Sequence, residues 1–111
     1  MKTIIAGGRH YDLTVQDIEK LDQLKDKITE VVSGCARGVD TQGENWAEKN
    51  NIKISKFPAE WDKYGKSAGY KRNQQMAKYA NAVVLFPGGK GTNHMYDIAK
   101  KEGLVVHDYR A

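Results

Sequence analysis

The sequence of 111 residues is poor in the residues that form covalent or metal cross-links, and it lacks long hydrophobic segments. Its single cysteine, Cys35, excludes an internal disulfide and fits a reducing compartment. One cysteine and three histidines are too few to predict a structural zinc site. No apolar run approaches a membrane span, and the apolar part of the N-terminus is too short for a secretory signal. We therefore expect one cytoplasmic domain over residues 1–111, with no metal and no membrane contact.

No block of like charge stands out either, although 18 lysines and arginines outnumber 14 aspartates and glutamates. The net charge of +4 favours an anionic partner such as a nucleotide, a phosphate ester or a nucleic acid. Most lysines are interspersed with acids, as in Lys25–Lys27, which is typical of solvated helix faces. A small anionic ligand is therefore expected before a nucleic acid.

What the sequence does contain is a series of short apolar runs that alternate with helix-compatible segments. Continuous short runs are typical of strands buried on both faces of a parallel sheet. The predicted strands are residues 2–6, 28–32, 52–57, 81–86 and 104–107. The first predicted helix follows a cap at Asp12 or Thr14 and carries Val15, Ile18, Leu21 and Leu24 at helical spacing. A second helix ends near residues 50–51, residues 59–66 are irregular, and later helices cover residues 69–79 and 93–101.

This alternation predicts an α/β fold, because parallel strands need crossover connections. Right-handed crossovers leave few topologies. We predict a single Rossmann-like three-layer domain with a five-stranded parallel sheet of order 3-2-1-4-5 and helices on both faces.

Glycine-rich turns follow three of the predicted strands, at Gly7–Arg9, Ser33–Gly38 and Pro87–Gly91. In such sheets, ligands bind beyond the carboxyl ends of the strands, where the strand order reverses. Glycines let the backbone approach a ligand, and a following helix start offers N–H groups to phosphate. The three turns therefore predict one crevice for a nucleotide-like ligand. The alternative for Pro87–Thr92 is an ordinary strand-to-helix turn that binds nothing.

Motifs along nearly the whole chain resemble those of the SLOG superfamily. Pro87–Thr92 resembles the PGGxGT motif of the LOG-type nucleotide phosphoribohydrolases, and Ser33–Asp40 resembles the SGxARGxD stretch of the Rossmann-like domain of DprA. The resemblance is greatest to the YspA-like family, formerly a domain of unknown function. That family typically shows GxR, GxARGxD, PAxWxxYGxxAGxxRNxxM and GGxGT, which correspond here to Gly7–Arg9, Gly34–Asp40, Pro58–Met76 and Gly88–Thr92. The resemblance implies a Rossmann-like fold and a nucleotide-derived ligand, with no other cofactor required and no settled reaction.

One position departs from the LOG pattern. LOG hydrolases carry a glutamate three residues after the GT pair, where this chain has Met95. Methionine cannot act as a general base, and glycoside-type chemistry normally needs a carboxylate near the anomeric carbon. Any hydrolase activity would therefore need another carboxylate, for which the candidates are Asp40, Asp97, Glu60 and Asp62.

Several charged candidates have two interpretations. Arg9 can bind an anion in a bidentate manner. Arg37 would contact phosphate or ribose, or else form an ion pair with Asp40. Asp40 would accept hydrogen bonds from ribose hydroxyls, or else cap the helix around Thr41. Lys90 would meet a phosphate or simply face water.

The remaining candidates are aromatic, amide or nucleophilic side chains. Trp61, Tyr64 and Tyr70 would stack on a base or pin their loop onto the core, and the core role is favoured. Arg72 and Asn73 are placed near the ligand only by the resemblance.

Two residues at helix starts are candidates for chemistry. His94 lies where its pKa is expected to fall, as a proton shuttle or as a solvated side chain. Cys35 lies where a helix start would lower the thiol pKa, although a small-residue packing role is favoured over a nucleophile.

The leading hypothesis is binding of a nucleotide or nucleotide-derived ligand, for sensing or sequestration. Hydrolysis of nucleotide N-glycosidic or phosphoester bonds, with Asp40 and His94 as candidates, is one alternative. DprA-like binding of single-stranded DNA is another, and a homodimer is expected. The predicted ligand-binding residues are Gly7, Gly8, Arg9, Ser33, Gly34, Arg37, Asp40, Trp61, Tyr64, Arg72, Asn73, Pro87, Gly88, Gly89, Lys90, Gly91 and Thr92.

Overall fold

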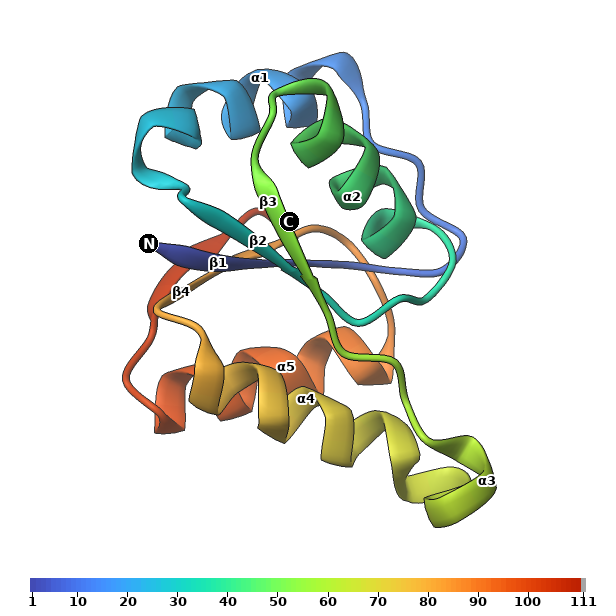
Figure 1. Ribbon diagram of the computed structural model, residues 1–111. Coiled ribbons are helices and arrows are strands. Elements are labelled where there is room, and N and C mark those ends of the chain that lie inside the picture. Colours follow the sequence, from blue (N-terminus) through green and yellow to red (C-terminus); the bar gives the residue numbers. More distant parts are fainter. Residues whose placement is uncertain (111) are drawn as a thin grey trace.

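A computed structural model describes residues 1–110 and shows one parallel sheet between two layers of helices (Figure 1). The strands are β1 (Lys2–Ala6), β2 (Glu30–Ser33), β3 (Lys53–Lys56), β4 (Ala82–Leu85) and β5 (Val105–Asp108). Their order is β3-β2-β1-β4-β5, and every neighbouring pair is parallel. The predicted fold class and strand order are therefore confirmed.

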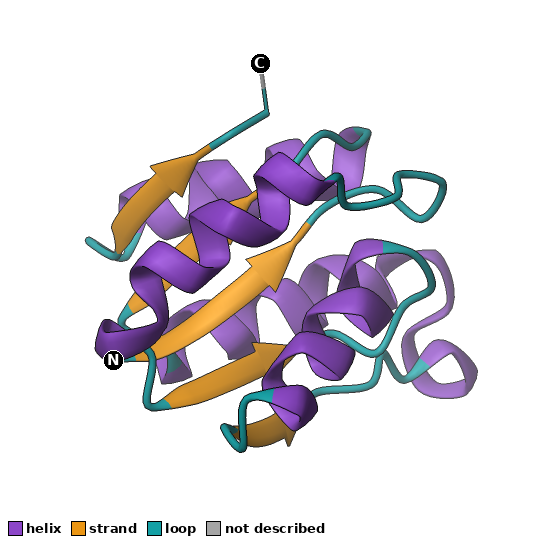
Figure 2. Ribbon diagram, turned by 90° about the horizontal axis from the view of Figure 1, so that it is seen from above, coloured by secondary structure: helices purple, strands orange, loops and turns teal. Residues whose placement is uncertain are grey.

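Two helices cover each face of the sheet. The helices are α1 (Val15–Leu24), α2 (Val39–Lys49), α3 (Trp61–Tyr64), α4 (Ala68–Tyr79) and α5 (Lys90–Lys101), with 3-10 turns at Lys25–Lys27 and Gly65–Ser67. Helices α1 and α2 lie on one face and α4 and α5 on the other, while α3 projects at one end (Figure 1). Figure 2 shows the strands running in one direction between these layers. None of the helices within residues 1–110 is long and apolar enough to cross a lipid bilayer.

The three central strands, β1, β2 and β4, are buried on both faces because their side chains alternate between two cores, whereas the edge strands β3 and β5 are partly exposed. Ile4 of β1 packs in the core under α4 and α5, together with Met76 and Met95. Its neighbour Ile5 packs in the core under α1 and α2, together with Trp46. Within the sheet, Ile4 pairs with residues of β2 and β4, so β1 lies at the centre. The turns that follow the central strands therefore start from neighbouring, well-packed positions in the sheet.

Some element boundaries differ from the sequence predictions. Strand β2 begins at Glu30 rather than at residue 28, because Ile28 closes the preceding 3-10 turn and packs into the core. Helix α5 begins at Lys90 rather than at residue 93, because Gly89 already serves as its N-cap. Part of the segment predicted as irregular forms α3. These differences bring the start of α5 closer to the sheet edge than the sequence suggested.

The cap of the first helix is resolved in favour of Thr14. Its hydroxyl accepts a hydrogen bond from the backbone N–H of Asp17, and the carboxylate of Asp17 accepts one from the N–H of Thr14, which forms a capping box. Tyr11 donates its hydroxyl to the same carboxylate at 2.6 Å. Val15 is 72% exposed, so it does not belong to the apolar face of the helix as predicted. The network holds the chain that leaves the β1 turn against α1.

Candidate functional site

The three glycine turns meet at the carboxyl edge of the sheet, as the topology predicts. The backbone N–H of Gly8 donates to the carbonyl of Pro87 at 2.9 Å, which joins the turn after β1 to the turn after β4. The N–H of Val39 donates to the carbonyl of Gly8 at 3.2 Å, which joins the same turn to the start of α2. The turn after β1 is thus held between the other two, at the point where the strand order reverses.

Two glycines are required by these close approaches. A Cβ atom at Gly88 would lie 2.7 Å from the backbone nitrogen of Gly8, so no side chain fits there. Gly38 has a φ of +75°, and a Cβ atom there would overlap the carbonyl oxygen of Gly8. The backbone itself, rather than side-chain packing, therefore shapes this edge.

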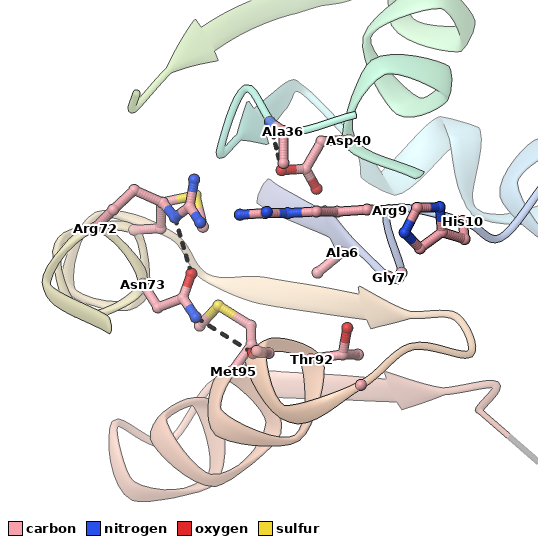
Figure 3. A pocket seen from close by; sticks show the side chains of 14 residues that line it. Ala6, Gly7, Arg9, His10, Ala36, Asp40, Arg72, Asn73, Thr92 and Met95 are labelled. Atoms are coloured by element: carbon pink, nitrogen blue, oxygen red, sulfur yellow. Dashed lines mark hydrogen bonds between the residues drawn. The ribbon is translucent and has the colours of Figure 1, made fainter. Parts of the chain in front are cut away.

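A cleft of about 330 Å³ opens where the turns meet (Figure 3). Its volume lies at the lower end of the range for small-molecule sites. It is lined by Ala6, Gly7, Gly8, Arg9, His10, Ala36, Asp40, Arg72, Asn73, Met76, Gly89, Gly91, Thr92 and Met95. The start of α5 forms part of its wall. The first N–H groups of a helix have no intrahelical partner, and no side chain of the N-cap residue Gly89 bonds to those of α5. The cleft is therefore open to an anion from this side.

Two guanidinium groups and one carboxylate dominate the electrostatics of the cleft. The side chain of Arg9 lies across the cleft and points toward Arg72, with Asp40 on one side and Thr92 on the other (Figure 3). Arg72 is partly buried, donates to the carbonyl of Gly34 and donates through Nε to Asn73 at 3.0 Å. Burial lowers the pKa of Arg72, and the charge of Arg9 lowers it further, against the opposing effect of Asp40. Like charges thus face each other, which favours an anion between them.

Asp40 is the carboxylate that lines this cleft. Burial raises its pKa to about 6, although the N–H of Ala36, which donates to it at 3.1 Å, and the charge of Arg72 act in the opposite direction. The group therefore exchanges its proton near neutral pH. Asp97, Glu60 and Asp62, the other candidate carboxylates, are exposed and do not line the cleft.

The side-chain amide of Asn73 connects the cleft wall next to Arg72 with helix α5. The side-chain nitrogen of Asn73 lies 3.3 Å from the carbonyl oxygen of Gly91 and 3.3 Å from Nδ1 of His94. His94 packs edge-on against Tyr70, with 4.3 Å between ring centroids. Burial lowers the pKa of His94, in the predicted direction, while Asp97 opposes the shift. Asn73 stands between His94 and the cleft, so the imidazole does not line it.

Comparison with known proteins assigns the chain to a family. Residues 1–64 match the YAcAr family, described as the YspA, cpYpsA-related SLOG family. The chain belongs to the YspA-related SLOG family. The gene 61 protein of Mycobacterium phage D29 is 36% identical over 87 residues, which span 71% of this chain and 70% of that protein. The resemblance inferred from the motifs is therefore confirmed.

Solved structures of low sequence identity share the fold. DNA processing protein A (DprA) from Streptococcus pneumoniae superimposes with a TM-score of 0.74 at 19% identity. The match covers 95% of this chain and 48% of DprA, so the chain spans about half of that protein. The structural genomics target TM1055 superimposes with a TM-score of 0.73 at 18% identity, over 96% of this chain and 72% of that one. Both matches support the Rossmann-like fold of this SLOG chain.

Two predicted residues of the SLOG motifs point away from the cleft. Ser33 is buried and donates its hydroxyl to Glu44 of α2, and it also accepts from the N–H of Cys35 at 3.1 Å. Ser33 therefore holds the second turn onto α2 instead of facing a ligand. Tyr64 packs its ring against Lys63 and Lys71 and lines a separate shallow hollow on α4. Both were predicted to bind ligand, and neither lines the cleft.

Other predicted residues lie around the cleft rather than in it. Gly34, Arg37 and Trp61 line an adjoining hollow, which shares Arg9, Ala36 and Arg72 with the cleft. Pro87 and Gly88 border a third hollow beside Arg110. Lys90 is exposed at the start of α5 and does not line the cleft.

Cys35 differs from its prediction in both packing and acidity. It is exposed, with a left-handed backbone (φ +63°), rather than packed among small residues. Partial burial of the thiol and the charge of Glu44 raise its pKa, although the helix start was expected to lower it. A raised pKa keeps the thiol protonated and makes a nucleophilic role unsupported.

Several residues of the cleft were missed from the sequence. His10 and Ala36 line the wall, and Ala6, Met76 and Met95 line the floor. His10 follows Arg9 directly, so the glycine turn after the first strand could have predicted it as a cleft residue. The floor residues are indistinguishable from ordinary core residues in sequence, since each also packs into the core below α4 and α5. Nowhere within residues 1–110 do three histidine, cysteine, aspartate or glutamate side chains gather closely enough to hold a metal ion.

Proposed function

We propose that this chain binds a nucleotide or a nucleotide-derived ligand in the cleft, as a sensor or a sequestering protein. The observation that carries the proposal is the pair of arginines, Arg9 and Arg72, which face each other with Asp40 as their carboxylate neighbour. A phosphate group would relieve this repulsion and accept bidentate hydrogen bonds from either guanidinium.

Two further features support a phosphorylated ligand. The backbone at Gly89 and Gly91 leaves open space toward the start of α5, where N–H groups and the helix dipole favour an anion. Membership of a SLOG family supports a nucleotide-related or DNA-related role in general terms. The cleft volume of about 330 Å³ favours a small molecule over a nucleic-acid strand.

The test begins with native mass spectrometry of freshly purified protein and identification of any small molecule that it retains. Titration with AMP at low salt then follows, with the variant Arg9→Gln beside the wild type. We expect Arg9→Gln to weaken binding by about tenfold or more, because a charge-assisted hydrogen bond is lost. Lys101→Gln, which removes an exposed charge in the last turn of α5, is the matched control and should leave affinity unchanged.

Failure of wild-type protein to bind any nucleotide would reject the proposal. A single-stranded oligonucleotide that binds with an affinity falling steeply with salt would then favour the DNA-binding alternative.

Hydrolysis of a nucleotide N-glycosidic or phosphoester bond is a second candidate, favoured by the pKa of about 6 at Asp40. A carboxyl group that titrates near neutral pH can act as an acid or a base. Met95, which stands at the position of the LOG glutamate, is buried and supplies no such group. Release of adenine or phosphate from AMP, abolished in Asp40→Asn, would support hydrolysis. Unchanged AMP after prolonged incubation would leave binding as the sole activity.

A further inference from the structure

The partners of Asn73 fix the direction of its side-chain amide, which is buried. Its oxygen accepts from Nε of Arg72 at 3.0 Å, and a guanidinium can only donate (Figure 3). Its nitrogen lies 3.3 Å from the carbonyl oxygen of Gly91, which can only accept. A flipped amide would bring two donors together at Arg72 and two acceptors together at Gly91. The amide therefore has one orientation in which its bonds are satisfied.

This orientation decides which nitrogen of His94 carries the proton. The amide nitrogen of Asn73 is a donor and lies 3.3 Å from Nδ1 of His94. Nδ1 must therefore accept, so the neutral imidazole carries its proton on Nε2. A protonated imidazole would place a second donor, the N–H of Nδ1, against the amide nitrogen. The hydrogen bonds of Asn73 are thus satisfied only while His94 is neutral.

The surroundings of His94 favour the neutral imidazole. Helix α4 presents to it the uncharged ring of Tyr70, whose centroid lies 4.3 Å away. Burial lowers the pKa of His94, and Asp97, which lies one turn further along α5, acts in the opposite direction. Strand β4 has no charged side chain, and Asp108 of β5 is already in an ion pair. The charge of His94 therefore changes at mildly acidic pH, below the ordinary pKa of 6.5.

Arg72 is the cleft residue at the other end of this network. It donates to the carbonyl of Gly34 as well as to Asn73, so two corners of its planar guanidinium are fixed. The hydrogen bonds thus run from the start of α5 to the turn after β2. Loss of the Asn73 contact would leave the guanidinium free to rotate about its contact with Gly34.

We propose that His94 is a positioning residue, which acts through Asn73 and holds Arg72 in place for an anionic ligand only while its imidazole is neutral. Protonation of His94 then weakens binding of the ligand, although it adds a positive charge to the protein. A direct attraction between the imidazolium and the ligand would have the opposite sign. The inference rests on the proposed function and adds to it the regulation of the same cleft by pH.

Titration with AMP near pH 7.5 and near pH 5 tests this sign. His94→Gln keeps a side-chain oxygen that can accept from Asn73 but does not titrate, whereas His94→Leu removes the acceptor. Near pH 7.5, we expect His94→Gln to bind as the wild type does and His94→Leu to bind about fivefold more weakly. Near pH 5, the affinity of the wild type should fall several-fold relative to that of His94→Gln. Protonation of Asp40 and of the phosphate of AMP affects both proteins alike, so it cancels in this ratio.

His107→Gln is the matched control, because His107 stacks on Tyr109 and does not line the cleft. Its affinity relative to the wild type should not change with pH. If the affinity of the wild type relative to His94→Gln stays constant or rises near pH 5, the inference is overturned and the proposed function stands.

The Nε–H resonance of Arg72 reports on the same network without a ligand. In nitrogen-15 NMR spectra, this resonance is assigned by its absence from Arg72→Lys. Its chemical shift should move as His94 titrates and should stay constant over that range in His94→Gln, and the nitrogen shifts of neutral His94 should place the proton on Nε2. A resonance that does not follow His94, or a proton on Nδ1, would refute the inference. If the resonance follows His94 but AMP binds at neither pH, the result counts against the proposed function alone.

Discussion

The carboxyl groups at the two ends of the sheet have pKa values shifted in opposite directions. At the amino end of β2, Glu30 accepts a hydrogen bond from Ser55 at 2.6 Å and another from Tyr79, and lies 3.6 Å from Nζ of Lys53. These donors lower its pKa. At the carboxyl edge, Asp40 accepts one hydrogen bond from within residues 1–110, from the N–H of Ala36, and its pKa is raised to about 6.

The difference separates a structural polar cluster from the cleft in which we propose that a ligand binds. Around Glu30 of β2, side chains from β3 and from α4 satisfy the carboxylate, so the cluster ties β2, β3 and α4 together. Around Asp40, the arginines remain incompletely paired, and the backbone of the glycine turns forms the wall. Incomplete pairing in a cleft is typical of functional sites. The comparison therefore predicts opposite responses to substitution at the two ends.

The largest effect is expected where the carboxyl edge depends on its backbone. Gly38→Ala should lower the free energy of unfolding by about 3 kcal/mol or more, because alanine is strained at this φ and its Cβ would overlap the carbonyl of Gly8. Gly89→Ala is the control, since nothing lies within 4 Å of a Cβ there and its φ is negative. Chemical denaturation measures both. Equal stabilities for the two variants would show that the edge is not built from close backbone contacts.

A smaller loss of stability is expected from a substitution at the amino end of β2. Glu30→Gln should lower the free energy of unfolding at neutral pH by about 2 kcal/mol, because charged hydrogen bonds are replaced by neutral ones in a site that is 7% exposed. Since the pKa of Glu30 is lowered on folding, its contribution is present above its ordinary value of 4.5 and is lost as the pH falls through the folded value. The variant should therefore lose part of the acid-induced destabilisation seen in the wild type.

Glu19→Gln provides the control for that measurement, because Glu19 is exposed on α1. A Glu30→Gln variant as stable as the Glu19→Gln variant at neutral pH would show that the cluster contributes nothing to the fold.

Most of the fold was predictable because the strands are short continuous apolar runs. Residues 2–6 were predicted and observed as a strand, and the chirality of crossovers then left the observed order. The four-residue helix α3 could not be predicted, since one turn shows no 3.6-residue periodicity and lies in an aromatic segment. Glu30 was not singled out either, because its partners come from β3 and α4, far along the chain.

The location of the site was predictable, whereas the directions of its side chains were not. The three glycine turns follow from the sequence, and parallel strands bring them together. Ser33 follows the same pattern but turns toward Glu44, which lies 11 residues away on the next helix. Its direction depends on that partner and on the strand's alternation, which local sequence does not determine.

The sharpest contrast with Glu30 is a gain of stability at Asp40. Because folding raises the pKa of Asp40 from 3.8 to about 6, the ionised form is disfavoured in the folded state. A difference of about two pKa units corresponds to roughly 3 kcal/mol, and the cost of burying an amide reduces the expected gain to about 1–2 kcal/mol. Asp40→Asn should therefore raise the free energy of unfolding at neutral pH, where Glu30→Gln lowers it.

The pH dependence of this gain identifies its cause. The protonated carboxyl of Asp40 stabilises the fold fully below its unfolded pKa of 3.8, and this stability is lost as the pH rises through about 6. The advantage of Asp40→Asn should accordingly be absent near pH 4 and complete near pH 7, while the exposed control Asp97→Asn shows no such profile. A destabilised Asp40→Asn variant at neutral pH would mean that the carboxylate is retained to pair with Arg9 and Arg72. A stabilised one would mean that stability is given up at this edge for a charged group that only a ligand makes favourable.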